Sequence, residues 1–170
     1  DFNILNVCLA VGATHSFANR NAICDAVDNF YGVDGRMEHI HTLCGVKYYD
    51  SAIDSTPSRT LATLSAFNKE RTVIILGGYD KNLSYDCLCE GLKNIKCAII
   101  CGVNSEKIAH VLKNRCKFML CNTFEDSVRT ASKIAEWGDS VLLSPASASY
   151  DMFEYYKKKS DKYKEIVRGL

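Results

Sequence analysis

Polar residues that could bind a small anion are concentrated in three short loops of this sequence. One loop, residues 144–149, reads Ser-Pro-Ala-Ser-Ala-Ser and directly follows the apolar run at residues 141–143. That run is typical of a buried parallel strand, and we expect a helix after the loop, with Tyr150, Phe153 and Tyr156 on one face. Hydroxyl and backbone N–H groups gathered at such a strand-to-helix connection favour an anion. The alternative is an ordinary serine-rich loop before a well-capped helix.

The other two loops contain a lysine and further hydroxyl groups. Residues 77–81 read Gly-Gly-Tyr-Asp-Lys; the glycines allow close backbone approach, and Lys81 supplies a charge suited to a carboxylate or phosphate. Residues 50–57 read Asp-Ser-Ala-Ile-Asp-Ser-Thr-Pro, in which Ser55 or Thr56 can cap a helix that begins at Pro57. Lys81 alone could equally be a solvated surface residue. The three loops together predict a crevice for a small dianionic or zwitterionic ligand.

The sequence shows no pattern typical of a nucleophile or a metal site. The four histidines, His15, His39, His41 and His110, do not have metal-ligand spacing. There is no Gly-x-Ser-x-Gly motif, no convincing Cys-His pair and no Gly-Lys-Ser/Thr phosphate loop. The predicted crevice therefore either binds its ligand passively or contributes half of an active site.

Apolar runs alternate with amphipathic segments from residue 36 onward. We expect a hairpin at residues 37–42 and 46–49, followed by strands at 72–76, 97–101, 118–121 and 141–143. The intervening helices are predicted at residues 58–67, 85–92, 105–113 and 124–137. This alternation predicts an α/β fold, a Rossmann-like, mostly parallel sheet with helices on both faces. In such sheets the loops after the strands meet at one edge.

The first 35 residues differ from the rest of the chain. Two amphipathic helices are predicted at residues 3–14 and 19–30, and Gly32 and Gly35 follow them. A helical pair of this size cannot bury its own apolar faces, which favours a piece of another domain. We therefore predict two regions, residues 1–35 and residues 36–170.

Composition limits the partners. The chain has 170 residues, is 47% apolar and carries a net charge of +1, which indicates neither a nucleic-acid nor an acidic-membrane partner. No apolar run approaches the ~20 residues of a membrane span. The nine cysteines include no Cys-x-x-Cys, and we expect small buried thiols in a reducing cytosol. The expectation is a cytoplasmic protein, monomeric, that binds small molecules.

These motifs resemble those of the Mur ligase family. Residues 144–153 are similar to the signature Ser-Pro-Ala-x-Ala-Ser-x-Asp-x-Phe of its D-glutamate-adding branch, and residues 77–81 match Gly-Gly-x-Asp-Lys. Residues 3–6 look like the family's Asn-x-x-Asn, and Arg36 falls at its inter-domain linker. Other Mur ligases and folylpolyglutamate synthases share the architecture but not the first string. The resemblance covers nearly the whole chain in the right order.

The resemblance implies an enzyme of bacterial peptidoglycan synthesis that joins D-glutamate to UDP-N-acetylmuramoyl-L-alanine. ATP with Mg2+ would phosphorylate the substrate carboxylate, and the amine of D-glutamate would attack the acyl phosphate. Residues 1–35 would be the end of the central ATPase domain, and residues 36–170 the C-terminal Rossmann-like domain. Most ATP and Mg2+ contacts would lie outside this sequence. The alternatives are a non-catalytic α/β module that binds a small anion or docks a partner, and a Mur-type ligase for another amino acid.

The resemblance also implies site residues. Lys81, with Ser55 or Thr56, would bind one carboxylate of D-glutamate, and Ser149 the other, helped by Tyr150 and Tyr156 at the start of the last helix. The ATP contacts implied are Asn3, Asn6, Arg36, Asp50 and Ser51. No catalytic residue is implied. Gly35 stands where the family usually has His before the linker arginine, and Ile53 stands near the position of a lysine common in the loop.

We predict that the purified 170-residue chain has no ligase activity by itself. Without a phosphate loop or metal ligands, the developing charge on a transferred phosphoryl group has no electrostatic support. The measurement is ADP release in the presence of ATP, Mg2+, D-glutamate and UDP-N-acetylmuramoyl-L-alanine. ADP release that requires both substrates would contradict the prediction.

Overall fold

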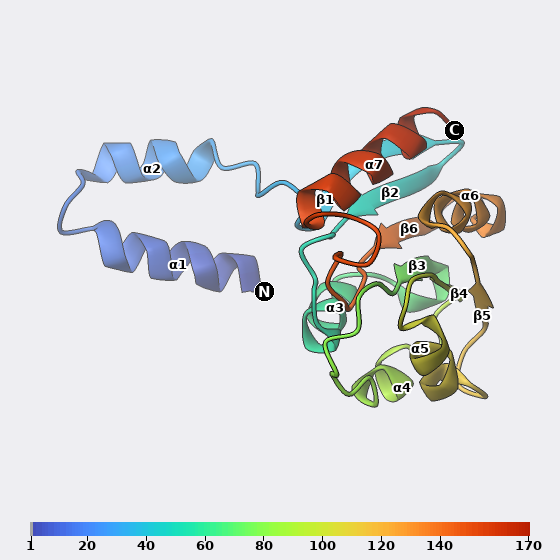
Figure 1. The fold of residues 1–170 in the computed structure, drawn as a ribbon. Coiled ribbons are helices and arrows are strands. Elements are labelled where there is room, and N and C mark those ends of the chain that lie inside the picture. The colour runs from blue at the N-terminus through green and yellow to red at the C-terminus, as the bar shows by residue number, and fades with distance from the viewer. Residues whose placement is uncertain (1) are drawn as a thin grey trace. The chain divides into compact units, whose positions relative to one another are not determined.

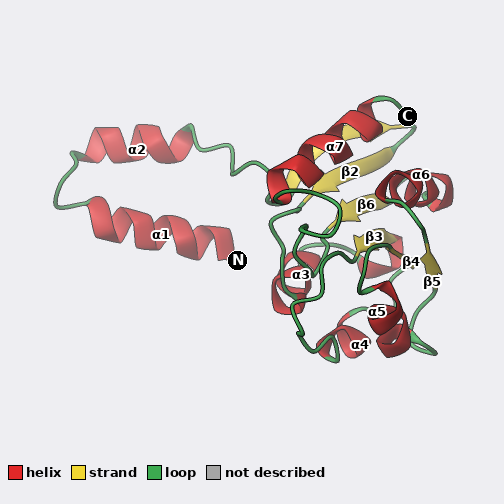
Figure 2. Ribbon diagram, in the orientation of Figure 1, coloured by secondary structure: helices red, strands yellow, loops and turns green. Residues whose placement is uncertain are grey.

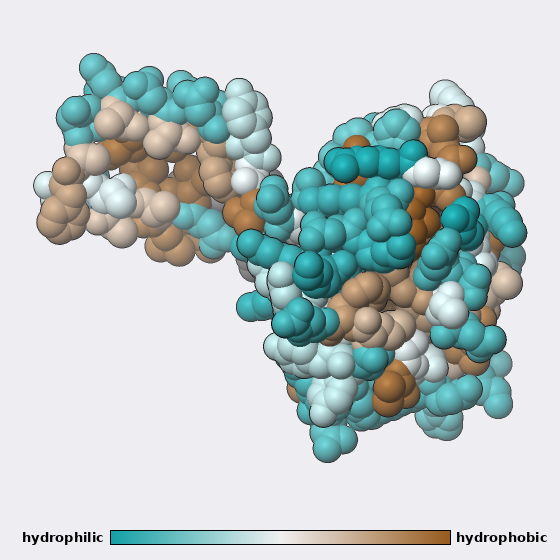
Figure 3. Space-filling view, turned by 45° about the horizontal axis from the view of Figure 1, so that its top comes forward, coloured by the Kyte–Doolittle hydropathy of each residue, from teal (hydrophilic) through white to brown (hydrophobic). Residues whose placement is uncertain are grey.

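The computed structural model describes the backbone of residues 2–170, and the side chains from residue 4 onward. The chain forms two compact units, one up to Val33 and one from Asp34 to Leu170. The first contains α1 (Phe2–Thr14) and α2 (Arg20–Asp28), the latter capped by the Asn19 side chain, which accepts a hydrogen bond from the Ala22 N–H. Many of its apolar side chains are exposed (Figure 3), among them Ile4, Leu5, Leu9, Phe17, Val27 and Phe30.

The second unit contains a six-stranded sheet with the order β1-β2-β6-β3-β4-β5 (Figure 1). β1 and β2 form an antiparallel hairpin, and every other neighbouring pair is parallel. The predicted mostly parallel α/β sheet is therefore confirmed. The strands are β1 (Glu38–Leu43), β2 (Val46–Asp50), β3 (Thr72–Leu76), β4 (Cys97–Ile100), β5 (Phe118–Leu120) and β6 (Ser140–Leu143).

Helices cover both faces of this sheet (Figure 2), because the central strands are apolar on both sides. In β3, Val73 and Ile75 pack in one cluster with α6 (Phe124–Ile134) and α7 (Tyr156–Arg168). Ile74 and Leu76 point the other way, into a cluster that also holds the apolar residues of the remaining helices. Those helices are α3 (Pro57–Leu64), α4 (Cys87–Gly91) and α5 (Ser105–Leu112), and a short 3-10 turn, η1 (Lys69–Arg71), precedes β3.

The order of the strands creates a topological switch point at β6, where the connections on its two sides run to opposite faces of the sheet. The chain leaves β2 and β3 into α3 and α4 on one face of the sheet, whereas it leaves β6 towards α7 on the opposite face. Since β6 lies between β2 and β3, the connections diverge at its carboxyl end. In open α/β sheets, this is where a crevice forms and ligands bind.

The last helix begins later than predicted. We expected it to follow Ser149 directly, but residues 150–155 form turns and α7 begins at Tyr156. The N–H groups of Met152 and Phe153 both donate to the Ser149 carbonyl, and the Phe153 ring packs edge-on against Phe124. These two local hydrogen bonds and one tertiary contact accompany a compact turn, and no helix N-terminus lies at Ser149.

The cysteine interpretation was partly wrong. Cys97 in β4 and Cys101 directly after it are buried as expected, but four cysteines are exposed: Cys8, Cys24, Cys44 and Cys87. All nine thiols are free. Among the residues that the structure describes, no helix combines the length and apolarity that a membrane crossing requires.

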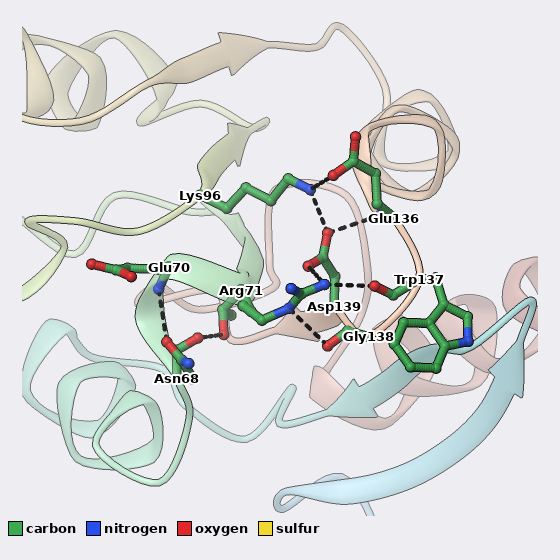
Figure 4. Close-up of polar contacts among 9 residues, drawn as sticks. Asn68, Glu70, Arg71, Lys96, Glu136, Trp137, Gly138 and Asp139 are labelled. Atoms are coloured by element: carbon green, nitrogen blue, oxygen red, sulfur yellow. Dashed lines mark hydrogen bonds and ion pairs between the residues drawn. The ribbon is translucent and has the colours of Figure 1, made fainter.

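An ion cluster ties the amino ends of the central strands together (Figure 4). The Asp139 carboxylate, 2% exposed, binds Lys96 Nζ at 2.5 Å and the Arg71 guanidinium at 3.1 Å, and it accepts the Glu136 N–H at 2.8 Å. Burial acts to raise the pKa of Asp139, but these partners outweigh it and lower the pKa below its ordinary value of 3.8. Residues that precede β3, β4 and β6 are thereby held together.

We predict that Asp139→Ala lowers the free energy of unfolding by about 3 kcal/mol, because it leaves two cations without their buried partner. Urea unfolding followed by circular dichroism measures this. Glu136→Ala is the matched control: its side chain is 80% exposed although it binds the same Lys96, so we expect less than ~1 kcal/mol. Since the folded-state pKa of Asp139 is lowered, its contribution should be complete above pH 3.8 and disappear as the pH falls through the folded-state value. Equal effects of the two substitutions would contradict the prediction.

Candidate functional site

The turn after β6 is the centre of the candidate site. Residues 144–149 are all buried, and two of their carbonyls bind the loop after β3: Pro145 accepts the Gly77 N–H at 2.8 Å, and Ala148 the Tyr79 N–H at 2.9 Å. A Cβ on Gly77 would lie 2.0 Å from the Cys101 carbonyl oxygen, and one on Gly78 2.2 Å from the Ala148 oxygen. Glycine at position 78 therefore allows the two loops to pack this closely, and glycine at position 77 allows the same loop to pack against the end of β4.

A buried side chain that the sequence analysis did not single out joins three strand-end loops. Asn104, 2% exposed, accepts the Gly78 N–H with Oδ1 at 2.8 Å. Its Nδ2 donates to the Tyr85 hydroxyl and to Ser147 Oγ, both at 2.6 Å. The amide thereby uses both donors and its acceptor inside the protein. One feature of the sequence points to Asn104: it comes shortly after the predicted strand at 97–101, and therefore lies at the same carboxyl edge of the sheet as the other candidate residues.

The loop after β2 reaches the same turn through Ser144. Ser144 Oγ donates to Asp54 Oδ2 at 2.7 Å and lies 2.9 Å from Thr60 Oγ1 on α3. Thr56 is the N-cap of α3 and Pro57 its first residue, as predicted, although the Thr56 side chain makes no capping hydrogen bond. Ser55 precedes it and is half-buried. All three predicted loops thus meet at the carboxyl end of β6.

The predicted ligands for D-glutamate differ in exposure. Lys81 is exposed, and Tyr150 is 64% exposed with its ring edge-on to Tyr79 at 6.2 Å between centroids. Tyr156 is half-buried at the start of α7. Ser149 is 3% exposed, and its Oγ has no hydrogen-bond partner among the described residues. The turn thus combines exposed polar groups at its rim with a buried hydroxyl that has no hydrogen-bond partner among the described residues.

A second ammonium group lies near this turn. Lys159 on α7 is 1% exposed, and its Nζ donates to the Gly77 carbonyl at 3.2 Å. Burial lowers the pKa of this ammonium. Asp151 Oδ2 accepts the Val103 N–H at 3.2 Å, whereas its Oδ1 is buried and has no partner within the described part of the chain.

Of the residues predicted to contact ATP, Arg36 lies between Gly35 and Met37, whose backbones contact the loop that contains Asp50 and Ser51. Asp50 is fully buried; its Oδ1 accepts the Ala52 N–H at 2.8 Å and its Oδ2 binds Ser160 Oγ, while burial raises its pKa. Ser51, also fully buried, accepts the Met37 N–H. Arg36 is exposed, as is Asn6 in the first unit. The predicted contact by the Asn3 side chain lies outside the described residues.

A hollow of about 690 Å³ lies elsewhere, at the amino ends of β2 and β6, where Lys47, Phe67 and Trp137 are among its lining residues. Ligands of parallel sheets bind at the opposite, carboxyl edge, so we do not assign this hollow to the site. Within residues 2–170, no three His, Cys, Asp or Glu side chains are placed to hold a metal ion.

Comparison with known proteins identifies the family of this chain. Residues 35–147 match the family model described as Mur ligase, glutamate ligase domain. UDP-N-acetylmuramoylalanine–D-glutamate ligase from Ruminiclostridium cellulolyticum is 36% identical over 178 residues, a match that covers 99% of this chain and 38% of that protein. The enzyme of the same name from Clostridium beijerinckii is 38% identical over 176 residues, with the same coverage. The chain thus spans about 38% of the length of these relatives.

Solved structures of low sequence identity share the fold. A pseudomurein peptide ligase type C from Methanothermus fervidus superposes with a TM-score of 0.72 at 15% identity, covering 99% of this chain and 36% of that one. The UDP-N-acetylmuramate-alanine ligase from Thermotoga maritima gives 0.69 at 17% identity and covers 99% and 38%. At these identities, the likeness supports the architecture alone.

We predict that Asn104→Ala destabilises the fold by about 2 kcal/mol, because it leaves the buried Gly78 N–H without its acceptor. It should also speed hydrogen exchange at the Gly78 amide, which NMR can measure residue by residue. Tyr85→Phe is the graded control: it removes one hydroxyl of the same network, and we expect a cost of about 1 kcal/mol with Gly78 exchange unchanged. Unchanged Gly78 exchange in Asn104→Ala would show that the side chain does not hold the loop.

Proposed function

This chain belongs to the Mur ligase family, and we propose that it is the amino-acid-binding part of a UDP-N-acetylmuramoylalanine–D-glutamate ligase. The observation that carries the proposal is the buried Ser149 Oγ, which has no hydrogen-bond partner among the described residues and lies in a turn packed against the Gly77–Gly78 loop. A ligand with two carboxylates needs donors at separate points, and the exposed Lys81 and the inner Ser149 can supply them. The names of the relatives support D-glutamate as that ligand.

The proposed reaction forms an amide bond at the expense of ATP. The carboxylate of UDP-N-acetylmuramoyl-L-alanine is phosphorylated, the amine of D-glutamate attacks the acyl carbon, and phosphate leaves. In this scheme the chain's own residues bind and orient D-glutamate: Lys81, with Ser55 or Thr56, at one carboxylate and Ser149 at the other. Holding the amine in position for attack makes the reaction effectively unimolecular, which is the main contribution of such a domain.

The described residues do not form a complete site for ATP and Mg2+. Carboxylates suited to Mg2+ do not cluster here, and the side chains of Asp50 and Ser51 are buried and bonded within the protein. The exposed Arg36 and Asn6 could contact a nucleotide edge, and Asn3 remains a prediction. We therefore derive no step through the nucleotide or the metal ion from these residues.

We further propose a bacterial, cytoplasmic setting and a monomeric enzyme. The relatives named above are bacterial ligases, and a net charge of +1 supports small-molecule substrates over nucleic acid or an acidic membrane. The proposal also keeps residues 1–35 as part of a central ATPase domain and residues 36–170 as the C-terminal domain; the compact unit from Asp34 to Leu170 supports that division.

We predict that D-glutamate binds the 170-residue chain and that Lys81→Ala weakens binding by roughly 2 kcal/mol, because a carboxylate loses its charged partner. Ser149→Ala removes a neutral donor and should cost about 1 kcal/mol. Titration with 15N-labelled chain, following amides of residues 77–81 and 144–150, measures both affinities. The control is Lys113→Ala, an exposed lysine at the end of α5, which should leave the affinity unchanged.

Parallel titrations with L-glutamate, D-aspartate, L-alanine and L-lysine determine the ligand class. Preference for D-glutamate supports the proposed ligase. Tighter binding of another amino acid would indicate a Mur-type ligase of different specificity, and absence of binding by all of them would overturn the proposed site. If Lys81→Ala bound D-glutamate within about twofold of the unsubstituted chain, ~0.4 kcal/mol, Lys81 would be a surface lysine.

A further inference from the structure

We propose that Lys159 is a positioning residue of the amino-acid site, whose buried ammonium fixes the Gly77–Gly78 loop and provides a second positive charge for an anionic ligand. This inference rests on the proposed function, because it assumes that the turn after β6 binds an amino-acid carboxylate. The site would then have a second cation besides Lys81, and this cation comes from α7, which follows all the strand-end loops in the sequence.

The position of Lys159 brings its charge directly under the loop. The side chain is 1% exposed and lies between the rings of Phe124 and Phe153, with Nζ 5.8 and 5.9 Å from their centroids. Nζ reaches the Gly77 carbonyl at 3.2 Å and would lie 3.3 Å from a Cβ on Gly78. The absence of a side chain on Gly78 leaves room for the ammonium beside the backbone here.

The charge of Lys159 is only partly compensated inside the protein: the charge of the Asp151 carboxylate opposes the effect of burial on the pKa of Lys159, but the two groups form no ion pair. An ammonium has three N–H donors, and within residues 2–170 only the Gly77 carbonyl accepts from it, with no carboxylate at ion-pair distance. Burial lowers the pKa of the group, since taking an ammonium out of water disfavours its charged form. An incompletely compensated buried cation destabilises a fold, whereas an apolar residue of similar volume would not. Stability alone therefore does not explain a lysine here.

Two buried polar atoms near the same loop have no hydrogen-bond partner among the described residues. Ser149 Oγ and Asp151 Oδ1 are buried without a hydrogen-bond partner in the described part of the chain. Asp151 Oδ2 lies 2.6 Å from the point where a Cβ on Gly102 would be, and that point is 2.7 Å from the Gly78 N atom. A hydroxyl donor, an incompletely used ammonium and a free carboxylate oxygen are thus arranged around the Gly77–Gly78 backbone. This set matches a zwitterionic ligand, whose carboxylate would gain from the hydroxyl and the positive charge.

The apolar surroundings of Lys159 allow its positive charge to act on a ligand that it does not touch. Two phenylalanine rings and the packed turn exclude water from Lys159, so its field is screened less than that of an exposed lysine. Its hydrogen bond also fixes the direction of the Gly77 carbonyl. The same residue thus orients the loop and attracts the ligand, and both roles depend on its charge.

The test compares Lys159→Met, which keeps the length and apolar volume, with Lys159→Arg, which keeps the charge, in the 170-residue chain. D-glutamate affinity is measured by NMR titration and the melting temperature by circular dichroism. We expect Lys159→Met to weaken D-glutamate binding by about tenfold while the melting temperature stays level or rises. Lys159→Arg should bind within about threefold of the unsubstituted chain. Lys158→Met, at an exposed position of the same helix, is the matched control and should change neither quantity.

A second readout uses the unsubstituted chain, so that a variant that fails to fold does not decide the outcome. The 15N resonance of the Lys159 ammonium should shift when D-glutamate saturates the chain, and that of Lys158 should not. If Lys159→Met binds within twofold and the Lys159 resonance does not move, the inference is overturned while the proposed function stands. If the unsubstituted chain binds no amino acid, the proposed function fails and the inference fails with it.

Discussion

The close contact between the Gly77–Gly78 backbone and the turn after β6 is the constraint on which the site depends. Two carbonyls of the turn, at Pro145 and Ala148, bind N–H groups of the loop after β3, and any Cβ on the glycines would collide with backbone oxygen atoms. Because β6 lies between β2 and β3, this contact occurs where the connections leave for opposite faces of the sheet. The packing of two backbones therefore determines both the position of the crevice and the residue types that can line it.

Around this contact, some buried polar groups are fully hydrogen-bonded and others are not. Asn104, Tyr85 and Ser147 satisfy one another and the Gly78 N–H, which makes that side of the loop rigid. Within the described part of the chain, Ser149 and Asp151 each have a buried polar atom without a hydrogen-bond partner, and Lys159 has unused donors. A saturated network beside an unsaturated one is the arrangement expected where a scaffold ends and a binding site begins, since unpaired buried groups are costly unless a ligand pairs with them.

The two edges of the sheet also differ in their electrostatics. At the amino ends, Asp139 is paired with Lys96 and Arg71, so charge there is neutralised within the protein. At the carboxyl ends, Lys81 is exposed, and the buried Lys159 donates a hydrogen bond to one carbonyl and to no other group among the described residues. Two lysines without an ion pair at this edge support the anionic ligand that we propose there.

The sequence by itself determined the α/β class, the parallel strands and the three loops that meet after β6, because apolar periodicity and glycine or serine positions act over a few residues. It placed the last helix too early: residues 150–155 form turns, in which Phe153 packs on the distant Phe124. The roles of Asn104 and Lys159 were also not predictable. Their partners lie 26 and 82 positions away in the chain, and whether a polar side chain is buried, paired or left with a free donor is decided by which distant segments fold against it.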